Sequence, residues 1–150
     1  MTRHDMIFDV NYSYHLEKMY FTILTRLDKA ITMLLIVLGF SVFAPFMSIF
    51  AFGVGVAVLS VMQLVYQYGQ AAGLSKEQMR QYRRLLVEID SLSDDELRNR
   101  LMKIQDADSV PWQSLMKAAF KRTCIQLEIE DDKKLTLRER ITAWLAGDLP

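Results

Sequence analysis

The sequence predicts an all-α membrane protein: a two-helix transmembrane hairpin whose long helices extend into the cytoplasm and join a small helical C-terminal domain. Two observations carry this prediction. Residues 30–75 contain no Asp, Glu, Lys or Arg, whereas residues 1–29 carry four charges of each sign and residues 76–150 carry fourteen of each. Outside this charge-free block, apolar residues recur at the three- and four-residue spacing of amphipathic helices.

The charge-free block is too long for one membrane crossing and suits two. As a single helix, its 46 residues would extend roughly 70 Å, against a hydrocarbon thickness of roughly 30 Å. Pro45 disfavours helix at the residue before it, so the chain is expected to reverse within 44–48. We therefore expect spans at about 30–44 and 47–66. The alternative, a soluble protein with a buried hairpin, would need a polar helix face that residues 33–40 lack.

Basic residues at the ends of the block predict its orientation. By the positive-inside rule, cationic residues near the ends of the spans stay in the cytoplasm, and the expected outer turn carries no charge. Both termini are therefore expected to be cytoplasmic, with these cations touching anionic lipid headgroups. They are Arg26 and Lys29 before the first span, and Lys76, Arg80, Arg83 and Arg84 after the second.

The first span is expected to belong to a longer helix that starts in the cytoplasm. An apolar stripe crosses the last charged residues before the block without interruption, and Ser13 suits the N-cap position. The stripe comprises Leu16, Tyr20, Ile23, Leu27, Ile31, Leu34 and Leu38. The expected divisions are a cytoplasmic segment at 1–29, the hairpin at 30–68 and a cytoplasmic helical domain at 69–150.

One face of the second span is small or polar. Its residues, which we call the small-polar stripe, are Gly53, Val56, Ser60, Gln63, Gln67 and Gln70. Within lipid, small residues let helices approach closely and amides pair across an interface. The simpler explanation is packing against Gly39 and Ser41 of the first span. A subunit interface, or the wall of a water-filled pore in an oligomer, would use the same face.

The segment after residue 70 predicts four short amphipathic helices. Residues 71–73 are expected to loosen the chain before the first of them. The start signals, in chain order, are Ser75 as a cap, the capping box of Ser93 with Glu96, Pro111 in a first turn, and Thr136. The acidic tract at 128–132 is expected to be a solvated connection. The last helix carries an apolar stripe of Leu137, Ile141, Trp144 and Leu145 before a terminating Gly147.

Each amphipathic helix must bury its stripe against its neighbours, the first helix or another subunit.

The sequence offers few candidate residues for catalysis, metal binding or nucleic-acid binding. A net charge of zero argues against nucleic acid as a partner, because phosphate binding needs an uncompensated basic surface. A single cysteine, Cys124, and the separated His4 and His15 lack metal-ligand spacing. We expect no catalytic residue, no cofactor and no metal.

The layout resembles the SLATT family of two-transmembrane effectors associated with nucleotide-signalling conflict systems. The resemblance lies in residues 14–18 before the spans, in 81–86 after them, and in the segment from Val110–Trp112 to Ala118–Phe120. It implies a bacterial effector that oligomerises in the inner membrane and opens a pore or disrupts the membrane when infection is sensed. This chain shows no sensor domain, so the resemblance implies a separate sensor protein or sensing by the cytoplasmic helices themselves.

The leading hypothesis is an oligomeric effector that perturbs the bacterial inner membrane in anti-phage defence, without catalysis. A second is a non-pore anchor or scaffold that holds a cytoplasmic partner at the membrane. A third is a prophage protein, either holin-like or a superinfection-exclusion factor, although holins seldom have such a long cytoplasmic part. The bilayer itself and further copies of the chain are the expected partners in the first hypothesis.

Overall fold

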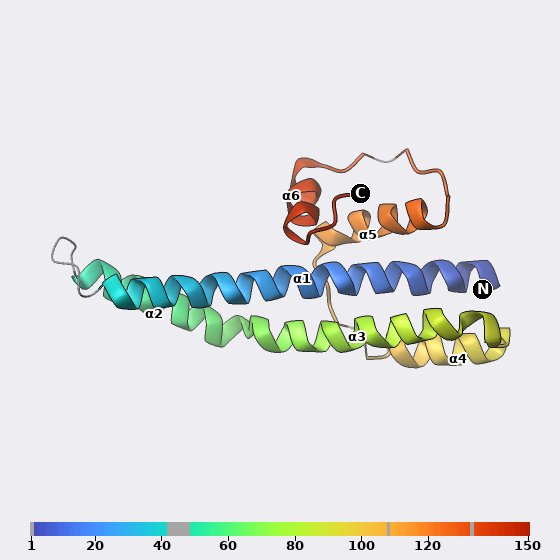
Figure 1. Ribbon diagram of the computed structural model, residues 1–150, viewed down its shortest axis with the longest axis horizontal. Coiled ribbons are helices and arrows are strands. Elements are labelled where there is room, and N and C mark those ends of the chain that lie inside the picture. Colours follow the sequence, from blue (N-terminus) through green and yellow to red (C-terminus); the bar gives the residue numbers. More distant parts are fainter. Residues whose placement is uncertain (1, 42–48, 108, 133) are drawn as a thin grey trace.

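The computed structural model describes residues 2–41, 49–107, 109–132 and 134–150, and among these residues every regular element is a helix (Figure 1). The all-α prediction is therefore confirmed. The expected chain reversal at 44–48 and the outer end of the first span lie outside the described residues. The helices are α1 (Arg3–Ser41), α2 (Ile49–Tyr66), α3 (Tyr68–Glu88), the short 3-10 helix η1 (Ile89–Ser91), α4 (Asp94–Gln105), α5 (Gln113–Gln126) and α6 (Leu137–Leu145).

Helix α1 forms the long axis of the molecule. Its 39 residues correspond to roughly 58 Å at about 1.5 Å per residue. The prediction that one helix crosses the charged boundary before the apolar block is confirmed. The predicted start at Ser13 is wrong, because α1 begins at Arg3. Thr2 and Asp5 cap it reciprocally, since the Asp5 amide donates to the Thr2 hydroxyl and the Thr2 amide donates to the Asp5 carboxylate.

The second arm of the hairpin bends at one residue and then continues as helix. Gln67 separates α2 from α3 and adopts a left-handed conformation with φ 43° and ψ 46°. The predicted loosening at 71–73 and the cap at Ser75 are wrong, because both lie within α3. The Ser75 side chain is fully buried against α1, so tertiary packing has overridden its preference for helix ends.

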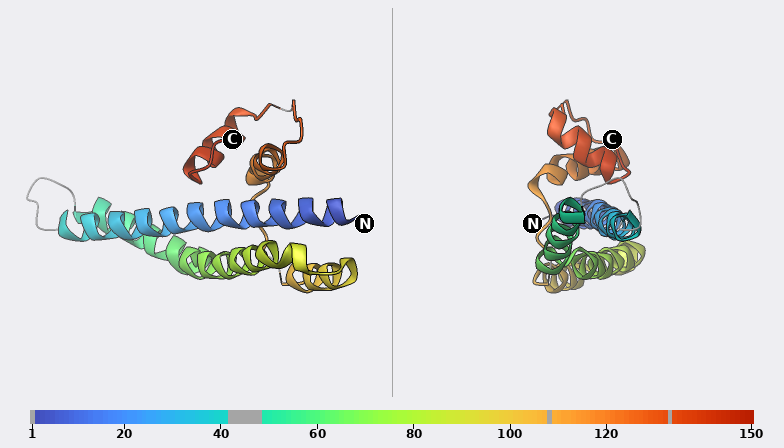
Figure 2. Two further views of the ribbon diagram at one scale, coloured as in Figure 1. Left: turned by 45° about the vertical axis from the view of Figure 1, so that its right-hand side comes forward. Right: turned by 90° about the vertical axis from the view of Figure 1, so that its left-hand side faces the viewer.

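Two small cores lie on opposite sides of α1 (Figures 1 and 2). Helices α3 and α4 cover one side and α5 with α6 the other. The α3–α4 core contains Met6, Val10, Tyr82, Leu85, Ile89, Leu97 and Leu101. The α5–α6 core contains Leu16, Met19, Ile23, Leu115, Ala118, Ala119, Ala143 and Ala146. Helix α1 is therefore the shared wall of the whole helical domain.

Most local signals at the helix ends are confirmed. Ser93 forms a capping box with Glu96 at the start of α4, and Thr136 forms one with Glu139 at the start of α6. Gly147 follows α6 with φ 76°, a conformation that suits glycine. Pro111 lies just outside α5, whose N-cap is Trp112. The acidic tract is mostly exposed non-helical chain, as predicted.

One described helical stretch, Phe50–Ser91, is long and apolar enough to cross a membrane. Only 6% of the residues in its most apolar stretch are buried within the chain. The core helix of a soluble protein would be largely buried there, whereas few residues of this stretch are.

Candidate functional site

Helices α1 and α2 meet through a face that differs from the predicted one. Gly55 is the small residue at this contact, because a Cβ atom there would lie 3.5 Å from the Leu38 side chain. The Gln63 amide donates to the Thr32 hydroxyl across the same contact at 3.4 Å. Phe52 is buried, at 8% exposure. The hairpin packs through this set, of which Leu38 and Gln63 belong to the stripes identified from the sequence.

Most of the small-polar stripe points away from α1. Cβ atoms added at Gly39 or Gly53 would meet no described residue within 4 Å, so these two glycines do not pack against each other. Ser60, Gln67 and Gln70 are exposed, while Val56 and Gln63 are half-buried. The side chain of Ser41 lies outside the described residues. The physical reason is rotation: Gly53 and Gly55 are about 200° apart around a helix, so only one can face α1.

Large apolar side chains surround the described part of the hairpin. Phe40 and Phe50 are 72% and 80% exposed, and Leu64 is 73% exposed. We call this surface the apolar girdle; it comprises Met33, Leu34, Ile36, Val37 and Phe40 on α1, and Phe50, Val54, Val58, Val61, Leu64 and Val65 on α2. The girdle contains no charged residue and extends over both helices, which is the pattern of a lipid-facing surface.

The inner end of the girdle is marked on both helices at the same level. Asp28 is the nearest neighbour of Gly69, where an added Cβ would lie 3.4 Å from the carboxylate. The rings of Tyr66 and Tyr68 stack beside this point, with centroids 5.4 Å apart. Aromatic rings of this kind favour the membrane–water interface. We call the level of Asp28 and Gly69 the boundary.

The basic residues that the sequence placed at the headgroups lie at different depths. Lys76 sits over the Phe21 ring, 5.8 Å from its centroid, and Lys29 is exposed. Arg80, Arg83 and Arg84 line an open groove with Val87 and Glu88. They follow Gly69 by eleven residues or more, which is roughly 16 Å or more along α3.

A buried carboxylate joins three parts of the helical domain below the boundary. Glu17 on α1 is 2% exposed. The Ser75 hydroxyl of α3 donates to it at 2.6 Å, and the Ser109 hydroxyl, in the chain leading to α5, donates at 2.7 Å. Buried charge requires such donors, because desolvation without them is costly. The sequence analysis missed this site, since a glutamate in an amphipathic helix gives no signal of burial.

Helix α5 is held on α1 by a second polar network. The side-chain oxygen of Gln126 accepts from Nε2 of His15 at 2.5 Å, and its amide nitrogen donates to the side-chain oxygen Oδ1 of Asn11 at 3.0 Å. Burial lowers the pKa of His15, whereas its hydrogen bond to Gln126 opposes that shift. Nδ1 of His15 has no hydrogen-bond partner among the described residues.

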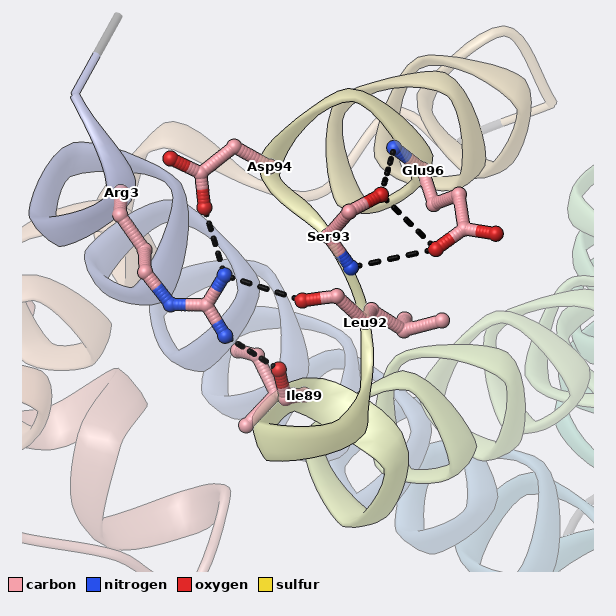
Figure 3. A network of polar contacts seen from close by, with 6 residues as sticks. All are labelled: Arg3, Ile89, Leu92, Ser93, Asp94 and Glu96. Atoms are coloured by element: carbon pink, nitrogen blue, oxygen red, sulfur yellow. Dashed lines mark hydrogen bonds and ion pairs between the residues drawn. The ribbon is translucent and has the colours of Figure 1, made fainter.

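Arg3 ties the start of α1 to the turn between α3 and α4. Its guanidinium donates to the Ile89 and Leu92 carbonyl oxygens and pairs with Asp94 at 2.6 Å (Figure 3). The capping box of Ser93 and Glu96 lies next to this contact. The acidic cluster at 94–96 thus has a local structural role in capping α4 and binding Arg3.

Within the described part of the chain, no group of three or more His, Cys, Asp or Glu side chains is arranged to hold a metal ion. Comparison with known proteins gave no further guide: no family model, curated protein or solved structure matches this chain. The apolar girdle and the two helices that carry it into the helical domain are therefore the candidate functional site.

Proposed function

We propose that the chain is a two-span protein of the bacterial inner membrane whose hairpins oligomerise and perturb or permeabilise the bilayer. The apolar girdle is the observation that carries this proposal. Exposed apolar surface costs about 25 cal/mol for every Å² left in water, and a girdle on two adjacent helices is far larger than scattered surface residues. Insertion into lipid removes that cost.

The arrangement of the hairpin supports two spans with one orientation. Helices α1 and α2 lie side by side, and the helical domain packs around the part of α1 that lies away from α2 (Figure 1). If α2 crosses the bilayer, the adjacent part of α1, with Met33 and Val37 exposed, lies at the same depth. Both chain ends then remain on the side of the helical domain. The basic residues on that side favour its being the cytoplasmic side.

The outward position of the small-polar stripe supports oligomerisation. Gly53 and Ser60 are exposed on α2 and are not used in the contact with α1. Small residues at such positions allow the backbone of a second hairpin to approach closely in lipid. The half-buried Gln63 lies at the edge of this face. Packing of copies through the stripe would place the polar side chains near a shared axis.

The proposed activity is conformational and requires no catalysis. Helix α1 runs from the α5–α6 core into the girdle as one element, so a change in the packing of the helical domain is carried directly to the first span. The resemblance to SLATT effectors supports a role in anti-phage defence. It also implies that a separate sensor protein, or the helical domain itself, receives the signal.

Membrane potential in cells that express the full chain tests this function. We expect induction to depolarise the cells, and Gly53→Leu or Ser60→Leu to weaken that effect by blocking close approach of the hairpins. Ala51→Leu is the matched control. Ala51 is also an exposed small residue of α2, but it lies on the opposite side of the helix from Gly53 and Ser60.

An unchanged potential in resting and phage-infected cells, with the protein present in the membrane fraction, would refute the perturbing activity. Equal loss in all three variants would show that any added bulk on α2 is harmful, and would remove the small-polar stripe from the proposal. Absence of the protein from the membrane fraction after carbonate extraction would refute insertion itself.

A membrane anchor for a cytoplasmic partner is the second candidate. The observation that favours it is the exposed apolar surface of the helical domain, where Val87 and Val110 are 80% and 88% exposed. A scaffold would bind its partner through such residues without conducting ions. Val87→Asp and Val110→Asp should then abolish crosslinking to a partner in cells, while the membrane potential never changes on induction.

A further inference from the structure

Helix α6 presents its apolar stripe outward. Leu137 and Trp144 are 72% and 66% exposed, and Ile141 is 50% exposed. The residues that α6 buries are small ones, Ala143 within the helix and Ala146 at its end. Of the expected partners for this stripe, the neighbouring helices and the first helix do not cover it, and no described residue lies over this face.

The docking site of α6 on α1 lies close to the boundary. Arg26 donates to the carbonyl oxygen of Leu145 in the last turn of α6, at 2.5 Å. Arg26 precedes the charge-free block by four residues, which is about 6 Å along a helix. The headgroup layer on each side of a bilayer is about 5–8 Å thick. The C-terminal end of α6 is therefore held at about the depth of the headgroups.

The face of α1 that holds α6 is the face that continues into the apolar girdle. Met19 and Ile23 pack in the α5–α6 core, and Leu34 and Val37 follow at helical spacing with 50% and 55% exposure. Lipids around this face of the first span would therefore have α6 directly beneath their headgroups. No other helix lies between α6 and the hairpin along this face among the described residues (Figure 1).

The direction of α6 suits a membrane surface. It crosses the long axis of α1, and its length is seen in the view along that axis (Figure 2, right). A helix that crosses α1 lies roughly in the plane of any bilayer that α1 spans. Amphipathic helices bound at a membrane surface lie in that plane, with aromatic and aliphatic side chains inserted among the headgroups.

The chemistry of the outward face suits anionic lipid. Arg138 and Arg140 are exposed on α6. A shallow groove of about 300 Å³ combines Arg140 with the apolar side chains of Leu137, Ile141, Trp144 and Leu149. Cationic groups beside an apolar stripe match the phosphate and upper acyl region of an anionic leaflet, and tryptophan favours that depth. A protein partner would have no need for α6 to lie at the boundary.

We infer that α6 is an interfacial helix that inserts Leu137, Ile141 and Trp144 into the cytoplasmic leaflet beside the first span. This inference rests on the proposed insertion of the hairpin. Through Arg26 and the α5–α6 core, the helix ties the position of α1 to the lipid surface. A change in lipid packing in that leaflet would then shift α6, and through it the helical domain.

Tryptophan quenching in nanodiscs tests the inference on the full chain. The chain has two tryptophans, so Trp112→Phe leaves Trp144 as the single reporter. Nanodiscs of phosphatidylcholine and phosphatidylglycerol carry bromine either near the headgroups or near the chain ends. We expect Trp144 emission to shift to shorter wavelength and to be quenched more strongly by the shallow bromine. Adding Ile141→Glu should abolish both effects, whereas adding Val110→Glu should leave them unchanged.

A reporter in the hairpin separates this inference from the proposed function. Phe40→Trp, in a chain that also carries Trp112→Phe and Trp144→Phe, reports insertion of the first span. No quenching of this reporter would refute hairpin insertion. Quenching at residue 40 but none at Trp144 would overturn the inference about α6 alone. A shift of Trp144 emission without quenching by either lipid would also overturn it, because a second copy or another protein segment would then cover α6.

Discussion

Ser75 of α3 and Glu17 of α1 share a 2.6 Å hydrogen bond that is buried between the two longest described helices below the girdle. The same hydroxyl also lies 2.9 Å from the Glu17 carbonyl oxygen. This contact fixes the register of α3 against α1, because a shift of one helical turn would leave the carboxylate buried without the Ser75 donor.

Ser75→Ala is expected to destabilise the helical domain. The substitution removes a donor to a buried carboxylate, and its cost is about 1–3 kcal/mol, even though Ser109 still donates to Glu17. Chemical unfolding in detergent, followed by maleimide labelling of the buried Cys124, measures the change. Ser91→Ala is the control, because that exposed hydroxyl donates to the Glu88 carbonyl oxygen within its own turn. Equal stability of the two variants would contradict a structural role for the buried bond.

The burial of His15 predicts that the stability of the folded chain decreases as the pH falls below 6.5. Burial lowers the pKa of His15 below its ordinary value of 6.5. Just below pH 6.5 the unfolded chain therefore binds more protons than the folded chain, so stability from this group is complete above 6.5 and falls as the pH decreases. Unfolding measured on both sides of pH 6.5 should show this slope. His15→Gln should reduce it, and an unchanged slope in His15→Gln would contradict the assignment.

Leucine substitutions at the two glycines of α2 are expected to differ in their effect on the stability of the hairpin. Gly55→Leu places a large side chain against Leu38, which is already 3.5 Å from an added Cβ, and should cost about 1–3 kcal/mol of hairpin stability. Gly53→Leu points into open space within a single copy and should leave that stability unchanged. Thermal unfolding of monomeric protein in detergent distinguishes them. A larger loss of stability for Gly53→Leu than for Gly55→Leu would show that Gly53, and not Gly55, faces α1.

Features that depend on residues close together in the chain could be predicted from the sequence. The helix starts after Ser93 and Thr136 depend on hydrogen bonds within four residues, and the apolar stripe of α1 depends on helical spacing alone, so both could be predicted. Ser75 and Gly53 have the same local signals as a cap and a packing glycine. Which face of a helix meets its neighbour is decided by the partner helix, and a single sequence does not contain that rotation. The same limit hid the burial of Glu17.

Substitution of Arg26 distinguishes two roles for this residue: a positive charge that sets membrane topology, and a contact that holds α6 on α1. Its guanidinium donates to a carbonyl at the C-terminal end of α6, where backbone oxygens need donors and the helix dipole favours a cation. Arg26→Ala should therefore loosen the last turn of α6, with amide hydrogen exchange at 143–148 accelerated about five-fold, which corresponds to about 1 kcal/mol. Lys29→Ala removes an equal charge one turn closer to the girdle from an exposed side chain. If charge near the boundary were the only function of Arg26, both substitutions would change topology alike and neither would accelerate exchange in α6. A selective effect of Arg26→Ala on residues 143–148 would instead show that this arginine holds α6 at the level of the headgroups.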